Sequence, residues 1–528
     1  MGMKLSQNKR IALNTIASYF RTVFAILCGV YSTRWVLMAL GQEDFGLFGL
    51  IGSLVIFISF LNIQFSSAIS RYYAYALGRS QNGNYSGEVG LDDCRSWFSV
   101  AVMIHVLIPL ILLLIGWPTG ECLIQYDYLN IPESKISQCV ILWRLICVST
   151  FVGMLNVPFQ AMFNAKQYIT ELTAYSVAQT IIRTGAVYYM ACNPGEWLVR
   201  YGVLMCVVAI VPQILICVRA TYIFPECRIR INALKELWRV RKLGGFAFWN
   251  GIGGLGYLAS HQCMSIIINK NFGARITGSF SLAQTLGAEA GALSGALQGA
   301  FLPAIATAFG AGDVDRMRNM ALQVCKFGTL LTLIFVLPMI LEIDELLLLW
   351  LKTPPPNVAS LCILTLLFIL IEKLSYGQLA AVSATGDVAK FQSIRGMLRI
   401  LALPFALIAV VLKFGVTWAA AALPASAAIV VVGDILIARF KIQLSVGAWF
   451  NNVLWPILLT FVIGGAIGVL PRLIMNQSLG RLVFTSLMSV SSILLCGWLF
   501  VLNQSERKNI LESLTGVSKK CFKRLNSI

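Results

Sequence analysis

The segment INALKELWRVRKL, residues 231–243, lies near the middle of the chain and separates two long runs of apolar sequence. Its apolar residues alternate with basic ones, and further Lys and Arg surround it between Arg219 and Lys242. This pattern is typical of an amphipathic helix on an anionic membrane surface, although a solvated polar linker would share it. Both interpretations predict a cytoplasmic joint over residues 223–244 between two membrane-embedded halves.

The composition places the chain among integral membrane proteins. Of its 528 residues, 58% are hydrophobic and 12% are charged, which is far more apolar than a soluble domain. A bilayer-spanning helix needs about 20 apolar residues, and the sequence offers about fourteen such segments, six before the joint and eight after it. They cover roughly residues 12–38, 46–76, 94–117, 136–162, 168–191, 198–222, 245–269, 277–309, 320–341, 358–384, 391–412, 417–438, 449–470 and 482–503.

The basic residues follow a topological pattern. The net charge is +18, but most Lys and Arg lie in loops on one side of the predicted helices, so they indicate orientation and contact with anionic lipid rather than nucleic-acid binding. The positive-inside rule places these loops and both termini in the cytoplasm. Lys270 with Arg275, and Arg472 with Arg481, fall on the other side and are exceptions.

A weak internal repeat relates the two halves. Shifting the chain by 232 residues aligns residues 46–78 with 278–310 without a gap and matches Gly46 with Gly278. The second helix is thereby paired with the eighth, which predicts two six-helix lobes in parallel orientation. The predicted domains are an N-lobe at 1–222, the joint at 223–244, a C-lobe at 245–440, two extra helices at 441–505 and a basic cytoplasmic tail at 506–528.

Three arginines lie inside apolar segments at a similar depth. At 1.5 Å per residue, Arg34, Arg144 and Arg183 are each about 9–12 Å below the outer surface. A lipid-facing arginine would cost about 2.5–3.5 kcal/mol, so we expect these to face a wet interior. With no acidic residue at their depth in the same segments, they predict a site for a multiply charged anion such as a phosphate. Snorkelling to the surface is the alternative for each.

Other ionisable residues lie in the second half. Glu289, Glu372 and Asp434 are candidates for ion coupling, since carboxylates inside membrane segments often mark ion pathways. Arg395 and Arg399 are close enough to the cytoplasmic end of their segment to be flanking charges. Gly287, Gly291, Gly295 and Gly299 follow one another at four-residue spacing, which predicts either tight helix packing or a smooth surface for sliding.

The sequence shows no pattern of catalysis or metal binding. Its 14 cysteines are scattered without a CxxC pair, and His105 and His261 are expected to be interior imidazoles. There is no nucleotide-binding loop and no catalytic dyad. We therefore expect a transporter that is not an enzyme and needs no cofactor.

Three stretches resemble a known family. ALGQEDFGLFGLIGSL (39–54), followed by FSSAISRYYAYALG (65–78), is similar to the opening of the Wzx-type O-antigen flippases. These belong to the multidrug/oligosaccharidyl-lipid/polysaccharide exporter superfamily. FWNGIGGLGYLASHQCMSIIINKNFG (248–273) resembles the seventh helix of that family and the loop that closes it.

The resemblance implies an all-α integral membrane fold, with the two lobes in a V around a central cavity and two extra C-terminal helices. It implies a function in lipopolysaccharide or capsule biosynthesis in the bacterial inner membrane. The substrate would be an undecaprenyl-pyrophosphate-linked oligosaccharide, flipped to the outer leaflet by alternating access. By analogy, Arg34, Arg144 and Arg183 would hold the pyrophosphate, and Trp249 and Asn250 would contact sugar.

Three other functions remain open at this stage. A multidrug exporter of the same superfamily would carry organic cations, which arginines would repel. A peptidoglycan-precursor flippase would share the fold. A polysaccharide polymerase would need a larger outer loop than this chain has. The expected partners are anionic lipid and the polymerase and chain-length machinery, with the chain acting as a monomer.

Overall fold

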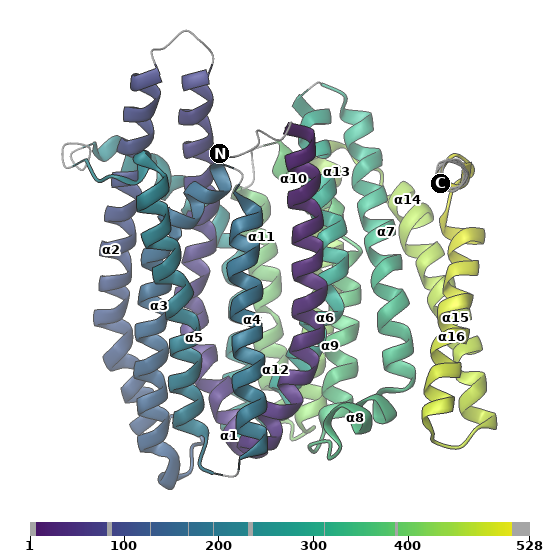
Figure 1. Cartoon of the computed structure of the whole chain (residues 1–528). Coiled ribbons are helices and arrows are strands. Elements are labelled where there is room, and N and C mark those ends of the chain that lie inside the picture. The colour runs from purple at the N-terminus through teal and green to yellow at the C-terminus, as the bar shows by residue number, and fades with distance from the viewer. Residues whose placement is uncertain are drawn as a thin grey trace, which may run out of the picture. The chain divides into compact units, whose positions relative to one another are not determined.

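The computed structural model describes residues 7–81, 87–126, 128–166, 168–193, 195–230, 236–310, 312–385 and 389–508, with some side chains in these ranges left out. Every regular element in them is helical (Figure 1). The α-helices are α1 (Gln7–Gln81), α2 (Gly87–Gln125), α3 (Ile136–Ala165), α4 (Ile169–Cys192), α5 (Leu198–Ile223), α6 (Leu237–Gly310), α7 (Val314–Leu341), α8 (Ile343–Leu351), α9 (Val358–Lys373), α10 (Tyr376–Ala384), α11 (Ala389–Ile400), α12 (Ala402–Val411), α13 (Val416–Ile442), α14 (Val446–Trp449), α15 (Trp455–Ile474) and α16 (Leu479–Cys496). Short 3-10 segments occupy Glu133–Lys135 and Pro225–Cys227, and π-helical segments η4 and η5 occupy Phe450–Leu454 and Gly497–Val501.

The predicted all-α membrane architecture is confirmed, and each predicted segment is helical. α1 contains the first two segments and α6 contains the seventh and eighth, while the tenth and eleventh are each broken in two. The short α8 was not predicted. In the part of the chain that the structure describes, nine helices are long and apolar enough to cross a membrane, or ten if the bent pair α9–α10 counts as one further span.

Both long helices are kinked at a glycine. Gly41 in α1 has φ 76° and ψ 175°, and Gly273 in α6 has φ 84° and ψ 173°. Glycine adopts this conformation without the steric cost that a side chain would add. The two positions differ by 232 residues, the shift of the sequence repeat, so the repeat includes the backbone break. Figure 1 shows α1 running down one side, turning at its lower end and returning.

The segments after the two kinks touch each other backbone to backbone. A Cβ on Gly46 would lie 2.1 Å from the carbonyl oxygen of Ala274, and one on Gly278 would lie 2.7 Å from that of Gln42. Ala274 is the repeat equivalent of Gln42, so the contact is reciprocal, as it would be across a two-fold axis. Only glycine allows two helices to approach this closely.

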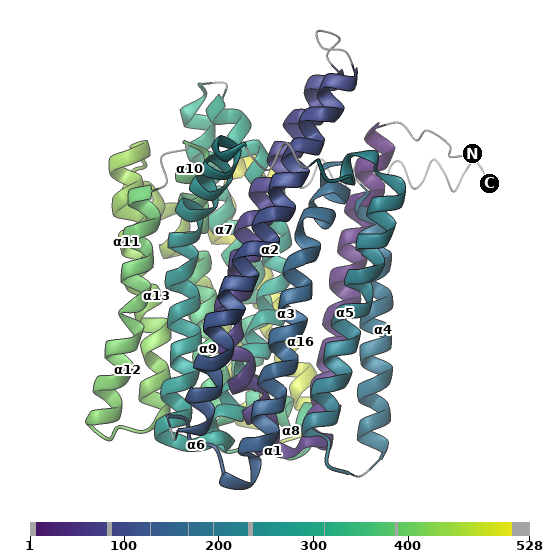
Figure 2. The same cartoon turned by 90° about the vertical axis from the view of Figure 1, so that its left-hand side faces the viewer.

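Contacts divide the chain into two compact units. Unit 1 comprises Met1–Leu286, Trp350–Leu364 and Val388–Ser426, and unit 2 comprises Gly287–Leu349, Thr365–Asp387 and Ala427–Ile528. α6, α9 and α13 therefore contribute to both units. Within unit 1, α3 and α5 run alongside each other (Figure 2). The lobe boundaries drawn from the sequence remain predictions.

In unit 2, the last two long helices are fastened to α7. Arg481 of α16 forms a buried ion pair with Glu342 (Nη2–Oε2 2.8 Å), and the Thr485 hydroxyl donates to the other carboxylate oxygen at 2.9 Å. A Cβ on Gly468 of α15 would lie 2.5 Å from Leu341. Arg481 was one of the exceptions to the positive-inside pattern. Its charge is balanced by Glu342, so it is a weak exception. Figure 1 shows α15 and α16 side by side.

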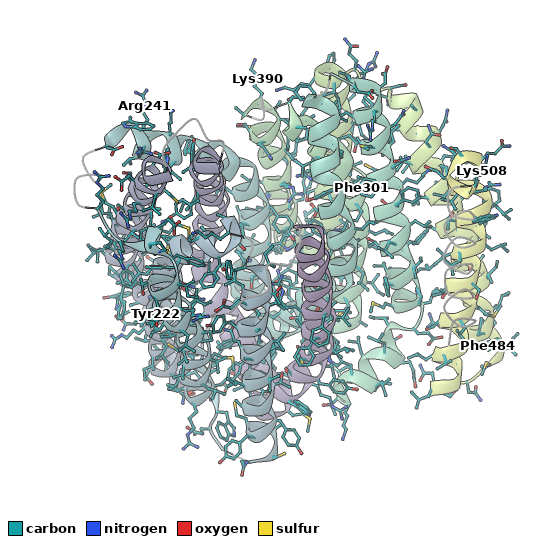
Figure 3. All side chains as sticks on the ribbon, turned by 45° about the horizontal axis from the view of Figure 1, so that its top comes forward. Tyr222, Arg241, Phe301, Lys390, Phe484 and Lys508 are labelled. Carbon is teal, nitrogen blue, oxygen red and sulfur yellow. The ribbon has the colours of Figure 1, made fainter. Side chains whose placement is uncertain are left out.

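Of the predicted amphipathic helix at 231–243, only the part after residue 235 is described. Residues 231–235 lie outside the described part, and the rest of the segment forms the first turns of α6, which begins at Leu237. Arg239 is buried between the rings of Trp97 and Trp238, 4.6 and 4.5 Å from their centroids, and pairs with Asp93 at 2.7 Å. Arg241 is exposed and projects from this end of the helix (Figure 3).

The glycine contact gives a direct test. Gly46→Ala is expected to lower the thermal unfolding midpoint of the purified protein by several degrees, because overpacking typically costs about 1–3 kcal/mol. Gly52→Ala is the matched control, since a Cβ there meets nothing within 4 Å. Equal midpoints for the two variants would contradict the proposed tight contact.

Candidate functional site

Arg144 on α3 has an acidic partner that the sequence analysis did not anticipate. Its Nε lies 2.7 Å from Oε1 of Glu121 and its Nη2 lies 3.2 Å from Oε2, a two-bond arrangement. Glu121 belongs to α2, which continues to Gln125 although the predicted segment ends at 117. The helix passes through Pro118, and the Thr119 hydroxyl donates to the carbonyl of Ile115 in the same turn. Glu121 lies outside the three segments in which the sequence analysis looked for acidic residues, so this pairing was not anticipated.

Arg34 and Arg183 lie on two helices that pack together. The hydroxyls of Ser32 on α1 and Thr184 on α4 are 3.3 Å apart, so the two arginines lie at the same level. Arg34 is partly buried, and its Nε has no hydrogen-bond partner among the described residues. Arg183 is exposed and lies near Tyr201, with which it interacts electrostatically. Whether these two and Arg144 form one anion site remains a prediction.

The proposed sugar contacts cannot be placed. Trp249 and Asn250 belong to α6, but their side chains lie outside the part of the structure that is described.

Of the three candidate coupling residues, Asp434 has the most distinctive position. It is 1% exposed, and its Oδ2 accepts a hydrogen bond of 2.7 Å from Ser375. Ser375 stands at the break between α9 and α10, where the axis bends by 41°, and the Trp449 indole donates to the carbonyl of Leu374 at 3.0 Å. A broken helix beside a buried carboxylate is a common arrangement in ion-coupled transporters.

The other two coupling candidates are less enclosed. Glu372 lies in the last turn of α9, three residues before Ser375, and Glu289 lies on α6. Both side chains are partly exposed and have interaction partners. A coupling role for Glu289, Glu372 and Asp434 remains a prediction.

The glycine column of α6 is packed at one end and open at the other. A Cβ on Gly287 would lie 2.6 Å from the Thr365 methyl group, one on Gly291 would meet Ile369 at an ordinary 3.5 Å, and one on Gly295 would meet nothing within 4 Å. Gly299 has no described surroundings. Tight packing therefore explains Gly287, while Gly295 faces open space in this conformation.

Two arginines that the sequence analysis treated as flanking charges are buried. Arg395 and Arg399 on α11 are each 8% exposed, and the Arg399 guanidinium lies 4.8 Å from the centroid of the Tyr257 ring on α6. His261, one turn further along α6, is buried as expected, and its ring lies 4.6 Å from that of Tyr257. The four side chains form a basic and aromatic cluster in unit 1, which we call the α6–α11 cluster.

Close helix packing creates this cluster. A Cβ on Gly256 would lie 2.4 Å from the Cα of Gly396, so α6 and α11 cross with their backbones in contact. The four-residue spacing of Arg395 and Arg399 places both on one helix face. That spacing, together with Gly396 between them, was the sequence signal that could have indicated burial.

The two chain segments that form the α6–α11 cluster contain basic but no acidic residues. The sequence contains no Asp or Glu between Leu237 and Leu286, or between Ala389 and Ser426. Planar guanidinium groups held against an aromatic ring are well suited to binding phosphate oxygens. This part of unit 1 can therefore attract an anion and would repel an organic cation.

Sequence comparison relates the chain to a membrane protein of Bacillus subtilis. No family model matches the chain. The uncharacterized membrane protein EpsK of Bacillus subtilis (strain 168) is 21% identical over 335 residues, and the match spans 61% of this chain and 61% of EpsK.

Two solved structures show the fold over most of the chain. The lipid II flippase MurJ in an inward closed conformation has a TM-score of 0.60 at 12% identity and covers 93% of this chain and 98% of that one. A multidrug resistance MATE family transporter of the MOP superfamily, in an inward-facing conformation, has a TM-score of 0.59 at 12% identity. It covers 80% and 94% of the two chains. The chain therefore has a MurJ- and MATE-like fold.

Variants of Arg144 and Glu121 can show whether Arg144 binds an anion or only stabilises the fold. If Arg144 binds an anionic substrate, Arg144→Ala should impair transport in a complementation assay, whereas Glu121→Gln should retain it because the guanidinium is then released. Arg200→Ala, at another exposed arginine, should have no effect. Equal loss of thermal stability in both variants, with equal loss of transport, would show a purely structural pair.

The glycine column predicts a graded response. Gly287→Ala should lower the thermal midpoint, because the added methyl meets Thr365, while Gly295→Ala should leave it unchanged. If the open space at Gly295 closes during transport, Gly295→Leu should stay monodisperse in detergent but lose transport. Normal transport by Gly295→Leu would exclude a moving surface there.

Proposed function

We propose that this protein carries an anionic, lipid-linked glycan across a membrane by alternating access. The observation that carries the proposal is the α6–α11 cluster, in which Arg395 and Arg399 are buried in elements without carboxylates. Arginines inside a membrane protein are costly unless they are paired or serve a polar ligand or a wet pathway. An anionic headgroup meets that requirement.

The fold supports transport in general but does not identify the substrate. A MurJ- and MATE-like fold fits flippases and exporters, and it gives no support to a polymerase enzyme. Between the two transporter classes, the charge of the cluster favours an anionic substrate over the organic cations of multidrug export.

The finer proposal follows the family resemblance of residues 39–54, 65–78 and 248–273. The substrate is then an undecaprenyl-pyrophosphate-linked oligosaccharide, such as an O-antigen or capsule repeat unit, flipped from the inner to the outer leaflet of the bacterial inner membrane. Arg34, Arg144 and Arg183 would contact the pyrophosphate nearer the outer side. Both termini would be cytoplasmic, as the basic loops predict.

The membrane potential can drive such a step. Moving one charge across 100 mV is worth about 2.3 kcal/mol, so a pyrophosphate with two negative charges gains about 5 kcal/mol per 100 mV when it moves outward. Asp434, with Glu372 and Glu289, would supply ion coupling if the potential alone does not suffice. Contacts with the polymerase and chain-length machinery belong to the same proposal.

A peptidoglycan-precursor flippase is the second candidate. It is favoured by the likeness to a structure described as the lipid II flippase MurJ, which covers 93% of this chain. Its substrate would also carry an anionic headgroup, so the α6–α11 cluster does not distinguish it from the first. Only the glycan chemistry separates the two candidates.

Reconstituted transport tests the proposal. In proteoliposomes, the protein should flip a fluorescent undecaprenyl-pyrophosphate oligosaccharide and should not transport ethidium. Arg399→Ala should slow flipping more than about tenfold, since a hydrogen bond to a charged group is worth about 1.5–3 kcal/mol. Lys390→Ala, an exposed position on the same helix, is the matched control. Transport of ethidium without flipping of the lipid would refute the proposal.

A further inference from the structure

A polar cavity in unit 2 is lined by residues that none of the sites above includes. It has a volume of about 270 Å³ and is formed by α7, η4 and the chain that follows η5. Its polar lining includes Asn319, Gln323, Lys326, Asn452, Asn503 and Glu506. The volume equals about nine water molecules at 30 Å³ each and falls below the 300–1,000 Å³ typical of small-molecule sites. The cavity is therefore suited to a small polar group and too small for an oligosaccharide.

The cavity contains one positive and one negative charge. Lys326 is 3% exposed and forms an ion pair with Glu506, whose side chain is 11% exposed. The carboxylate also accepts hydrogen bonds from Gln323 at 3.4 Å and from the backbone N–H of Asn503 at 2.9 Å. The site is thus neutral overall but strongly dipolar. A ligand that carries both charges would fit it without leaving an unpaired charge.

Exposed aromatic and apolar residues adjoin the cavity residues in the sequence, as is typical of a membrane surface. Phe450 of η4 and Phe500 of η5 are 45% and 47% exposed, and Trp455 and Leu499 beside them are 48% and 50% exposed. Aromatic side chains gather at the interface between lipid tails and headgroups. Lys508, shortly after the cavity residues, is exposed toward the end of α16 opposite to Phe484 (Figure 3). Polar cavity and apolar patch therefore lie next to each other.

The backbone around the cavity is irregular. Both η4 and η5 are π-helical, and π-helical turns are rare and often accompany functional sites. The Arg507 side chain hydrogen-bonds the backbone at the end of η5: its Nε and Nη2 donate to the carbonyls of Leu502 and Leu499 at 3.0 and 2.8 Å. The cation that faces the cavity is therefore Lys326.

We propose that this cavity binds the headgroup of phosphatidylethanolamine, with its phosphate at Lys326 and its ammonium at Glu506. The acyl chains would lie along the exposed apolar residues of η4 and η5. A purely anionic headgroup would meet the Glu506 carboxylate. A choline headgroup has the same charges but cannot donate hydrogen bonds to the carboxylate or to the amide oxygens of Asn319 and Asn452.

Lipid-dependent stability of the purified full-length protein tests the proposal. Dioleoyl phosphatidylethanolamine, added in mixed micelles, should raise the thermal midpoint by several degrees. Equal amounts of dioleoyl phosphatidylcholine and dioleoyl phosphatidylglycerol should not. Asn319→Leu, at an exposed residue of the lining, should remove this shift while leaving the lipid-free midpoint unchanged. Arg316→Gln, on an exposed turn of the same helix, should leave the shift intact.

Two further variants address the charges. Lys326→Gln and Glu506→Gln should each abolish the preference for phosphatidylethanolamine, which is measured as the ratio of bound lipids by native mass spectrometry. Equal shifts from phosphatidylethanolamine and phosphatidylcholine would overturn the proposal. So would a phosphatidylethanolamine shift that persists in Asn319→Leu. The proposal is independent of what the protein transports.

Discussion

The contact of two glycine backbones, Gly46 in α1 and Gly278 in α6, is the constraint on which unit 1 depends. The carbonyl oxygens of Gln42 and Ala274 occupy the space that a Cβ would need on the opposite helix. Such an approach requires that both chains turn sharply just before they meet. Positive φ angles at Gly41 and Gly273 supply that turn. Beside the contact, the backbone N–H of Asn130 donates to Asn269 at 3.0 Å, which ties a loop to the same place.

Much of this architecture could be predicted from the sequence, because a membrane helix is set mainly by length and hydropathy. The shift of 232 residues in the alignment of 46–78 with 278–310 also relates the two kinked glycines, although the alignment begins after them. The breaks within segments were harder to anticipate. Ser375 interrupts a helix inside an apolar run, and its role becomes clear only through its bond to Asp434.

The candidate sites were less predictable, because charge pairing depends on where helices end and how they cross. The predicted segment 94–117 ends too early, because α2 continues through Pro118 to Gln125 and brings Glu121 to Arg144. Distance from a helix end suggested that Arg399 is solvated, whereas the crossing of α6 and α11 covers it. In the first case the predicted helix end was wrong, and in the second the position along the helix did not reveal the neighbouring helix that buries the side chain.

The buried ion pair between Arg481 and Glu342 bears on how such a chain could gain or lose its last helices. A shortened protein that ends before α15 would leave Glu342, now 2% exposed, without its partners Arg481 and Thr485. Removing one side of a buried pair typically costs about 3–5 kcal/mol. A functional truncation would therefore need a compensating apolar residue at position 342. The helix pair is thus held in place by a carboxylate that follows directly after α7.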